Sequence, residues 1–374
     1  SEHPGIATGA IGYLTDPVEC ETALTNGTSD VVFLGRPLIT DAAFPNKAAE
    51  GKTGDIRYCV SCNSCWRSII EAGALACDNN PKVGEPDELL VAAPSVATHR
   101  HVVVVGTGVA ALEAAHTAAA NGHKVTVLGD HEAFGGKTRI HAQMPGGENL
   151  SSVYDYQYLR AQQLGVEFEL GRQANVDDVL SFGPDVVLLA TGSRAARPEW
   201  LPEEWFAQGL IPSLRDMAKQ LAQGMGRAPG RAVIVDQDHT EMTYATALRM
   251  ANYFDQITLV TSRERFAHDV SLINRQGILK RLFERQVELI CHVEPESVAQ
   301  LEEGQFTLRN VYNGTLETLE SVASVIHASS RVPNNFLLAP LLAEGLDAIP
   351  VGDCKAPRSL MSATREGYDI AKAL

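Results

Sequence analysis

The chain has 374 residues, 45% of them apolar, and a formal net charge of −15. That length is enough for two or three domains with cores of their own, and the acidic balance argues against nucleic acid as a partner, because phosphate binding needs a basic face. No apolar run is long enough to cross a membrane, and with no export signal at its start we expect the chain in the cytoplasm, where seven cysteines favour metal or redox use over disulfides.

The first segment, residues 1–50, predicts one strand–helix–strand unit. Residues 5–11 and 30–35 are short apolar runs that we expect to form buried, parallel strands. Between them, residues 16–27 have the capping aspartate, the early proline and the closing glycine of a helix.

The second segment, residues 51–95, is dominated by four cysteines and has little periodicity, so we expect loops and short helices. The cysteines follow the spacing C-x2-C-x2-C-x11-C and are Cys59, Cys62, Cys65 and Cys77. Three thiolates this close can wrap one face of a cubane cluster that a distant fourth closes, whereas structural zinc usually takes two separated pairs. The spacing favours a [4Fe–4S] cluster, with zinc and unliganded thiols as the alternatives.

The third segment begins after a turn-rich linker at residues 93–100 and carries a glycine loop between a strand and a helix. The pattern G-x-G-x-x-A falls at Gly106, Gly108 and Ala111. Gly106 would make the turn, Gly108 would let the backbone approach a pyrophosphate at the helix N-terminus, and Ala111 would permit close packing. An acidic residue should then end the next strand to hold a ribose. Asp130, one residue late, is our candidate.

Three further motifs, each at a strand end or a helix start, favour FAD or ADP over a nicotinamide cofactor at this loop. Their candidate binding residues are Gly136 and Lys137 in "FGGK", Ala190, Thr191 and Gly192 in "ATG", and Gly352 and Asp353 in "VGDCKAPR".

A second strand–helix–strand unit, residues 231–262, lacks the glycine loop. The stretch "DQDHTEM" stands in its place, where Asp236 and Asp238 would repel a pyrophosphate. We therefore expect NAD(P)H not to bind there in the ordinary way, and the unit to serve packing or docking. The repeated units predict an α/β protein whose parallel sheets carry helices on both faces.

The whole chain resembles the C-terminal part of the trimethylamine dehydrogenase and 2,4-dienoyl-CoA reductase family. The matching stretches are "LGRPLITDAAFPNKAAEG", "DIRYCVSCNSCW", "CDNNPKVGE", "VGTGVAALEAA", "FGGK", "LLATGS" and "GDCKAPR". Members of this family join an old-yellow-enzyme-type FMN barrel to a [4Fe–4S] segment and a disulfide-reductase-like nucleotide domain.

The resemblance implies four parts. Residues 1–50 would be the end of a (β/α)8 barrel, strands seven and eight, with Gly9, Gly35 and Arg36 at the FMN phosphate. The remaining parts would be the [4Fe–4S] segment at 51–95, an FAD- or ADP-binding Rossmann-like domain at 96–211 and 325–374, and a degenerate NAD-type Rossmann-like domain at 212–324. Most of the barrel, with the family's catalytic residues, would lie outside this sequence, so the chain would be a fragment or one half of a split enzyme, inactive on its own.

The resemblance also implies the function. The glycine-poor second unit is similar to the amine dehydrogenase branch, in which electrons pass from FMN through the cluster to an electron-transferring flavoprotein during oxidative N-demethylation of a methylated amine. The alternatives are an NAD(P)H-dependent 2,4-dienoyl-CoA or enoate reductase and a non-catalytic electron-transfer subunit. We expect a small-molecule substrate and a homo-oligomer.

Overall fold

The computed structural model describes residues 5–86, 88–89 and 98–374, so most of the predicted linker at 93–100 lies outside the described residues. The chain divides into two compact units, each assembled from separate stretches. The first comprises Ser1–Gly136, Ser151–Gly192 and Asn335–Leu374, and the second comprises Lys137–Leu150 and Ser193–Asn334. Within the described ranges, no helix is both long and apolar enough to span a membrane.

The N-terminal segment is a parallel pair of short strands joined by a helix. The elements are β1 (Gly9–Ile11), α1 (Pro17–Thr25) and β2 (Val31–Phe33). The helix begins as predicted, since the Asp16 side chain accepts a hydrogen bond from the first turn and Glu19 reaches back to the cap. The prediction of buried strands is wrong, because Ile11 and Phe33 are 78% and 55% exposed. Among the described residues only these two strands pair in this sheet, and two strands cover neither face.

The cysteine segment folds into loops and short helices, as predicted. Its elements, with the two helices that lead into it, are α2 (Arg36–Thr40), α3 (Phe44–Ala49), the 3-10 turn η1 (Thr53–Asp55) and α4 (Ser64–Ala72).

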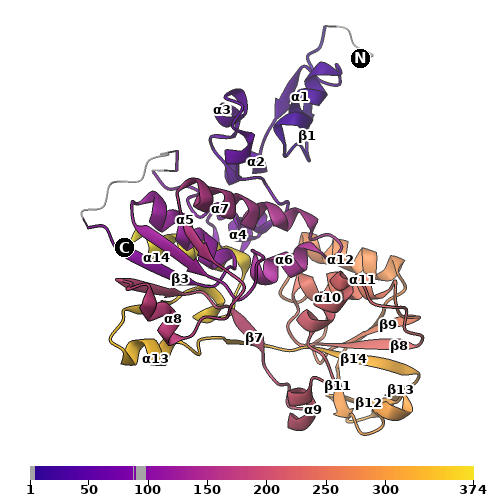
Figure 1. The fold of residues 1–374 in the computed structure, drawn as a ribbon. Coiled ribbons are helices and arrows are strands. Elements are labelled where there is room, and N and C mark those ends of the chain that lie inside the picture. Colours follow the sequence, from indigo (N-terminus) through magenta and orange to yellow (C-terminus); the bar gives the residue numbers. More distant parts are fainter. Residues whose placement is uncertain (1–4, 87, 90–97) are drawn as a thin grey trace. The chain divides into compact units, whose positions relative to one another are not determined.

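The core of the first unit is a five-stranded parallel sheet in the order β16-β6-β3-β4-β5 (Figure 1). The strands are β3 (His101–Val105), β4 (Lys124–Leu128), β5 (Glu167–Glu169), β6 (Val186–Leu189) and β16 (Ala348–Pro350). The helices are α5 (Val109–Ala120), α7 (Ser151–Gln163), α8 (Val176–Ser181), α13 (Leu338–Ala343) and α14 (Leu360–Lys372), with the 3-10 turn η4 (Gly352–Cys354).

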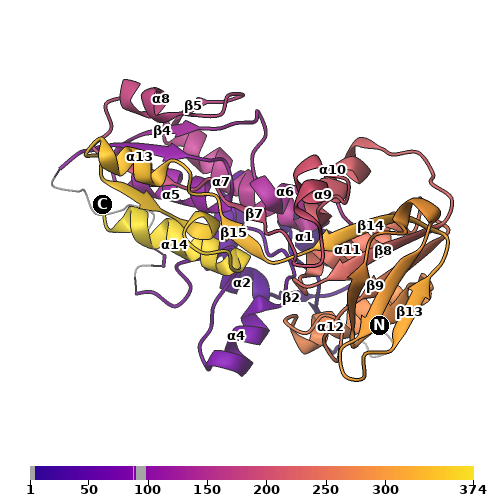
Figure 2. The same ribbon diagram turned by 90° about the horizontal axis from the view of Figure 1, so that it is seen from below.

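Both faces of this sheet are covered, which explains the unbroken apolar run in β3. Val102 and Val104 pack with α5, α7 and α14, whereas Val103 and Val105 pack with α8 and α13. Helices α5 and α14 lie side by side (Figure 2), and a Cβ added at Gly367 of α14 would lie 2.6 Å from the Ala110 carbonyl oxygen of α5. The small residues of α5 are therefore a requirement of close helix packing.

The second unit contains a four-stranded parallel sheet in the order β10-β9-β8-β14. Its strands are β8 (Arg231–Asp236), β9 (Gln256–Val260), β10 (Glu288–Ile290) and β14 (Val322–Ala328). Its other elements are α6 (Gly136–Ala142), which begins at the last residue of the first unit, then η2 (Glu148–Leu150), β7 (Ser193–Ala195), α9 (Glu203–Gln208), α10 (Leu214–Gln223), α11 (Glu241–Met250), α12 (Leu272–Glu284), β11 (Val293–Ser297), η3 (Leu301–Glu303), β12 (Phe306–Asn310), β13 (Leu316–Leu319) and β15 (Arg331–Pro333).

The prediction of helices on both faces is wrong for this second sheet. Ala232 and Ile234 pack with α10, α11 and α12 on one face. Val233 and Val235 on the other face pack against the antiparallel sheet β11-β12-β13, through residues such as Phe306. Along the strands between residues 293 and 319, buried and more exposed residues alternate, as in a sheet with one buried face. This face packs on the β10-β9-β8-β14 sheet where we had expected helices.

A buried ion pair fastens the cysteine segment to α5. The Arg57 guanidinium donates to both carboxylate oxygens of Glu113, at 3.0 and 2.8 Å, and to the Asn79 carbonyl at 2.5 Å. The Tyr156 ring lies 4.4 Å from the guanidinium carbon. One side chain thus joins α5 to the chain on both sides of the cysteine run.

Glu113 is fully buried and has further partners. The Gln157 amide donates to it at 2.8 Å, and His116 Nε2 lies 3.2 Å away. Burial by itself would raise the pKa of Glu113, but the charge of Arg57 and the contact with His116 outweigh burial and hold the pKa well below its ordinary value. The carboxylate therefore stays ionised in the folded protein.

Replacing Glu113 by glutamine should lower the free energy of unfolding by about 3 kcal/mol at neutral pH, because it leaves the Arg57 charge buried without its partner. Since the pKa of Glu113 is lowered by folding, its contribution is complete above the ordinary carboxyl pKa of about 4.3 and is lost as pH falls toward the lowered value. Urea titrations at several pH values test this, and the difference from the unaltered protein should shrink in acid.

Glu71→Gln is the matched control. Glu71 pairs with Arg67 on α4, and both side chains are exposed, so the loss should be below about 1 kcal/mol. Equal losses in the two variants would contradict the importance of the buried pair.

Candidate functional site

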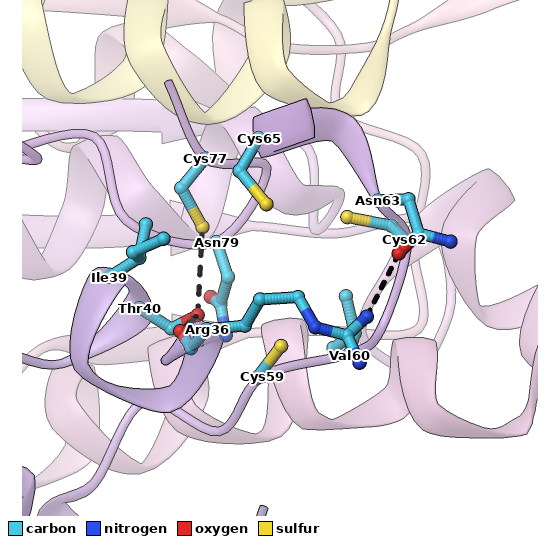
Figure 3. A pocket seen from close by; sticks show the side chains of 10 residues that line it. All are labelled: Arg36, Ile39, Thr40, Cys59, Val60, Cys62, Asn63, Cys65, Cys77 and Asn79. Carbon is cyan, nitrogen blue, oxygen red and sulfur yellow. Dashed lines mark hydrogen bonds between the residues drawn. The ribbon is translucent and has the colours of Figure 1, made fainter. Parts of the chain in front are cut away.

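The four predicted metal-ligating cysteines come together around one pocket (Figure 3). Cys59, Cys62 and Cys65 come from the loop before α4 and its first turn, and Cys77 comes from the loop after it. The other lining residues are Arg36, Ile39, Thr40, Val60, Asn63 and Asn79.

The backbone around the cysteines is sharply turned. Ser61 and Asn63, which alternate with the first three cysteines, have φ of +56° and +59°. This left-handed conformation costs a non-glycine residue roughly 1–2 kcal/mol, and here it reverses the chain so that the thiols face one volume. Asn63 tolerates it well, because asparagine is enriched in this region.

The thiols lie in a partly buried, hydrogen-bonded environment. Burial raises the pKa of Cys62, Cys65 and Cys77, and for Cys77 the backbone N–H groups of Asn79 and Asn80 partly offset this effect. A bound metal would deprotonate such thiols outright, and N–H groups facing sulfur stabilise the thiolate form.

The donor set suits a thiolate-ligated metal centre. Four cysteines are the usual ligands of a [4Fe–4S] cluster and can also hold zinc. Throughout the part of the chain that the structure describes, no group of three or more His, Cys, Asp or Glu side chains is close enough to hold a single metal ion. The four thiols that line the pocket are the donors that a [4Fe–4S] cluster needs.

Arg36, predicted at an FMN phosphate, lies in the cysteine pocket. It is the first residue of α2, and its guanidinium donates to Asn63 Oδ1 at 2.9 Å. Gly35 caps α2 with open space beside it, whereas a Cβ added at Gly9 would lie 2.2 Å from the Phe33 ring. The contact with FMN stays a prediction for all three predicted residues.

The glycine loop after β3 has the shape that a pyrophosphate site needs. Gly106 has φ of +126°, and a Cβ there would lie 2.3 Å from the Ala190 carbonyl oxygen, so only glycine fits. Gly108 is the N-cap of α5, makes no side-chain cap and has nothing within 4 Å of its Cβ position. The first backbone N–H groups of α5 therefore have no capping side chain, and an anion bound there would be stabilised. Ala111 is fully buried against the sheet.

Two of the later motifs meet this loop, although they are far away in sequence. Gly136 approaches it closely, since a Cβ there would lie 3.2 Å from the Gly108 Cα. Gly352 packs on the first turn of α5, where its Cβ would lie 2.8 Å from that of Ala110. Lys137 follows Gly136 in α6.

The "ATG" and "VGDC" motifs meet each other beside it. The Thr191 hydroxyl donates to the Cys354 sulfur at 3.2 Å, and Gly192 has φ of +76°. Asp353 is buried and accepts a hydrogen bond from the Arg358 backbone at 3.1 Å. The glycine loop, Gly136 and the "ATG" and "VGDC" motifs thus lie together at one end of the five-stranded sheet.

The position before Asp130 is crowded. A Cβ at Gly129 would lie 2.5 Å from the Thr107 methyl and 2.8 Å from the Leu170 side chain, so a residue larger than glycine there would require these side chains to move. Asp130 is exposed beyond the end of β4, next to His131. Its contact with a ribose stays a prediction.

In the second unit, a carboxylate of the protein lies at the helix N-terminus. Asp238 accepts hydrogen bonds from the Thr240 backbone at 3.0 Å and the Thr243 hydroxyl at 2.7 Å, where α11 begins. Asp236 ends β8, is fully buried and accepts a hydrogen bond from the Tyr244 hydroxyl at 2.6 Å. Burial and the neighbouring Asp238 raise the pKa of Asp236 to about 7. The site that would hold a phosphate is filled by the chain itself.

Sequence reasoning missed Arg57, Glu113 and Asn63, which tie the cysteine pocket to its surroundings. One signal was available, because Glu113 is a lone carboxylate inside an alanine-rich helix. The acceptor for Arg36 could not be foreseen, since it depends on the left-handed turn at Asn63.

Residues 100–346 match the family described as pyridine nucleotide-disulphide oxidoreductase. Along its whole length the chain is 28% identical to a bilirubin reductase of Mediterraneibacter gnavus and spans 56% of that protein. Over 59% of its length it is 30% identical to an N,N-dimethylglycine/sarcosine dehydrogenase of Chromohalobacter salexigens, of which the match covers 32%.

Solved structures have the same fold. The histamine dehydrogenase of Rhizobium sp. 4-9 superposes with a TM-score of 0.86, at 24% identity, over 98% of this chain and 55% of that one. The chain therefore spans about half the length of the relatives that it matches from end to end. Its match over residues 100–346 shows that the chain belongs to the pyridine nucleotide-disulphide oxidoreductase family, whose flavoprotein fold binds FAD and NAD(P).

Proposed function

We propose that the chain is the electron-transfer half of an iron–sulfur flavoprotein dehydrogenase that oxidises a methylated amine. The observation that carries the proposal is the pocket lined by Cys59, Cys62, Cys65 and Cys77. It belongs to a segment that Arg57 fastens to the same helix, α5, whose N-terminus would form the nucleotide site.

The residues have distinct tasks in this proposal. The four cysteines would ligate a [4Fe–4S] cluster in the partly buried pocket. Gly106, Gly108 and the first turn of α5 would hold the pyrophosphate of FAD or ADP. When bound, the flavin groups would accept two electrons from the amine and the cluster would transfer them singly.

The substrate site would be an FMN barrel that residues 5–35 help to complete, with the rest supplied by sequence beyond these 374 residues or by a separate chain. The reaction would take a methylated amine and water to the demethylated amine and formaldehyde, releasing two electrons and two protons. The electrons would leave to an external acceptor such as an electron-transferring flavoprotein. A homo-oligomeric state and a cytoplasmic location are parts of the same proposal.

Electron flow from the amine to an external acceptor is favoured by Asp238, whose carboxylate occupies the N-terminus of α11. A nicotinamide cofactor would usually place its pyrophosphate at that helix terminus. The similarity to an N,N-dimethylglycine/sarcosine dehydrogenase is in line with an amine substrate. The similarity to a bilirubin reductase along the whole chain favours a second candidate, an NAD(P)H-dependent enoate or dienoyl reductase.

Replacing Cys62 by serine should remove most of the iron and the broad visible absorbance of the purified protein, because the cluster loses one of its four ligands. Iron and acid-labile sulfide analyses measure the loss. Cys291→Ser, outside the pocket, should leave both unchanged. Stoichiometric zinc without iron in the unaltered protein would rule out the cluster.

Gly108→Ala should weaken ADP binding at least tenfold while leaving the fold intact, because its methyl group enters space that is open in the protein and that the pyrophosphate would occupy. Isothermal calorimetry measures the affinity. Gly106→Ala is the contrasting variant, since its methyl group would meet the Ala190 carbonyl and should destabilise the protein by about 2 kcal/mol. Unchanged ADP affinity in Gly108→Ala would place the nucleotide elsewhere.

NADPH and NADH should bind more weakly than about 1 mM, because Asp238 occupies the anion site of α11. Calorimetric titration with each cofactor, and with ADP as the positive control, tests this. Micromolar NADPH binding would exclude the amine dehydrogenase proposal in favour of the reductase.

A further inference from the structure

One charged side chain in the cysteine pocket, so far expected only at an FMN phosphate, has no role yet in the proposed cluster site. Of the residues that line the pocket, Arg36 is the one with a basic side chain. Figure 3 shows this side chain extended along the pocket, with its guanidinium turned toward Asn63. It comes from α2, which precedes the cysteine segment in the chain.

The position of the guanidinium is held by a specific contact. Asn63 Oδ1 accepts a hydrogen bond from Arg36 Nη1 at 2.9 Å. Asn63 lies between Cys62 and Cys65 in the sequence and has a left-handed backbone conformation. The charge is thus attached to the turn that presents the thiols. An arginine stays charged at every pH that the protein meets, so this positive charge is permanent.

A buried acidic side chain also lies beside the cysteines. Asp78 accepts a hydrogen bond from the Ser64 hydroxyl at 2.9 Å, interacts with the Cys62 thiol and is not among the residues that line the pocket. Among the described residues no ion pair joins Arg36 to Asp78, and the Arg36 guanidinium carbon lies 5.9 Å from the centre of the Tyr13 ring. Arg36 therefore supplies the basic charge among the residues that line the pocket.

We propose that Arg36 sets the reduction potential of the cluster that the cysteines would hold, and so rests this inference on the function proposed above. Reduction adds one electron and no proton, so the reduced cluster carries one more negative charge than the oxidised cluster. A fixed positive charge in a poorly solvated pocket stabilises the more negative state. Arg36 thereby makes the cluster a better acceptor of electrons from the flavin side, and it acts as a positioning charge, not as a ligand.

The test is a potentiometric titration of the protein with its cluster, followed by the electron paramagnetic resonance signal of the reduced cluster. In Arg36→Gln the ratio of reduced to oxidised cluster at a fixed potential should fall roughly tenfold, a shift of about 59 mV to more negative potential. Arg36→Lys, which retains the charge, should restore most of the potential. Arg67→Gln, which removes an exposed arginine of α4 outside the pocket, should leave it nearly unchanged.

The outcomes distinguish this inference from its competitors. An unchanged potential in Arg36→Gln with full iron content would overturn it, and loss of FMN without a change in potential would assign Arg36 to the flavin phosphate instead. Should Arg36→Gln fail to hold a cluster, Arg36→Met serves as a second neutral variant, and failure of both would show a role in assembly and also overturn it. Absence of iron from the unaltered protein would instead overturn the proposed function.

Discussion

The buried ion pair between Arg57 and Glu113 is the interaction on which the arrangement of the first unit depends. Two charges with 11% and 0% exposure are costly to remove from water, and here the cost is offset by two charge-assisted hydrogen bonds and the adjacent Tyr156 ring. The same guanidinium also reaches the Asn79 carbonyl, just after the last cysteine. Helix α5 thereby holds the cysteine segment at one side and presents the nucleotide loop at its N-terminus, so two candidate cofactor sites share one support.

The two units use the same strand–loop–helix plan with opposite electrostatics. At α5, the N-cap is a glycine that supplies no capping side chain, so no side chain takes the place of an anion there. At α11, the Asp238 carboxylate already accepts hydrogen bonds from Thr240 and Thr243. A parallel sheet and a helix are therefore not enough to predict a nucleotide site, because a single carboxylate at the helix start can take the place of the phosphate.

Much of the fold and of the candidate site follows from local pattern. The apolar runs of β3 and β8, the glycine loop and the cysteine spacing were each sufficient to place an element or a set of donors, because backbone period, turn chemistry and ligand spacing are properties of neighbouring residues. The sequence pattern gave the wrong prediction where residues far away in the chain decide what packs on a strand. The N-terminal strands are apolar but exposed, and the second sheet is covered by strands β11–β13 on one face, because what packs on a strand is not encoded in that strand.

The amino-acid sequence by itself determined the α/β class, the order of the elements, the four cysteines and the loop at Gly106, since these depend on residues close together in the chain. Only the tertiary structure decided that Arg57 binds Glu113 across 56 positions, that Asp238 fills the start of α11 and that Arg36 lies with the cysteines. Each of these involves a charge whose partner is chosen by burial and distance. A charged side chain can reach many partners in an unfolded chain, and the packed core leaves it only the few that lie beside it.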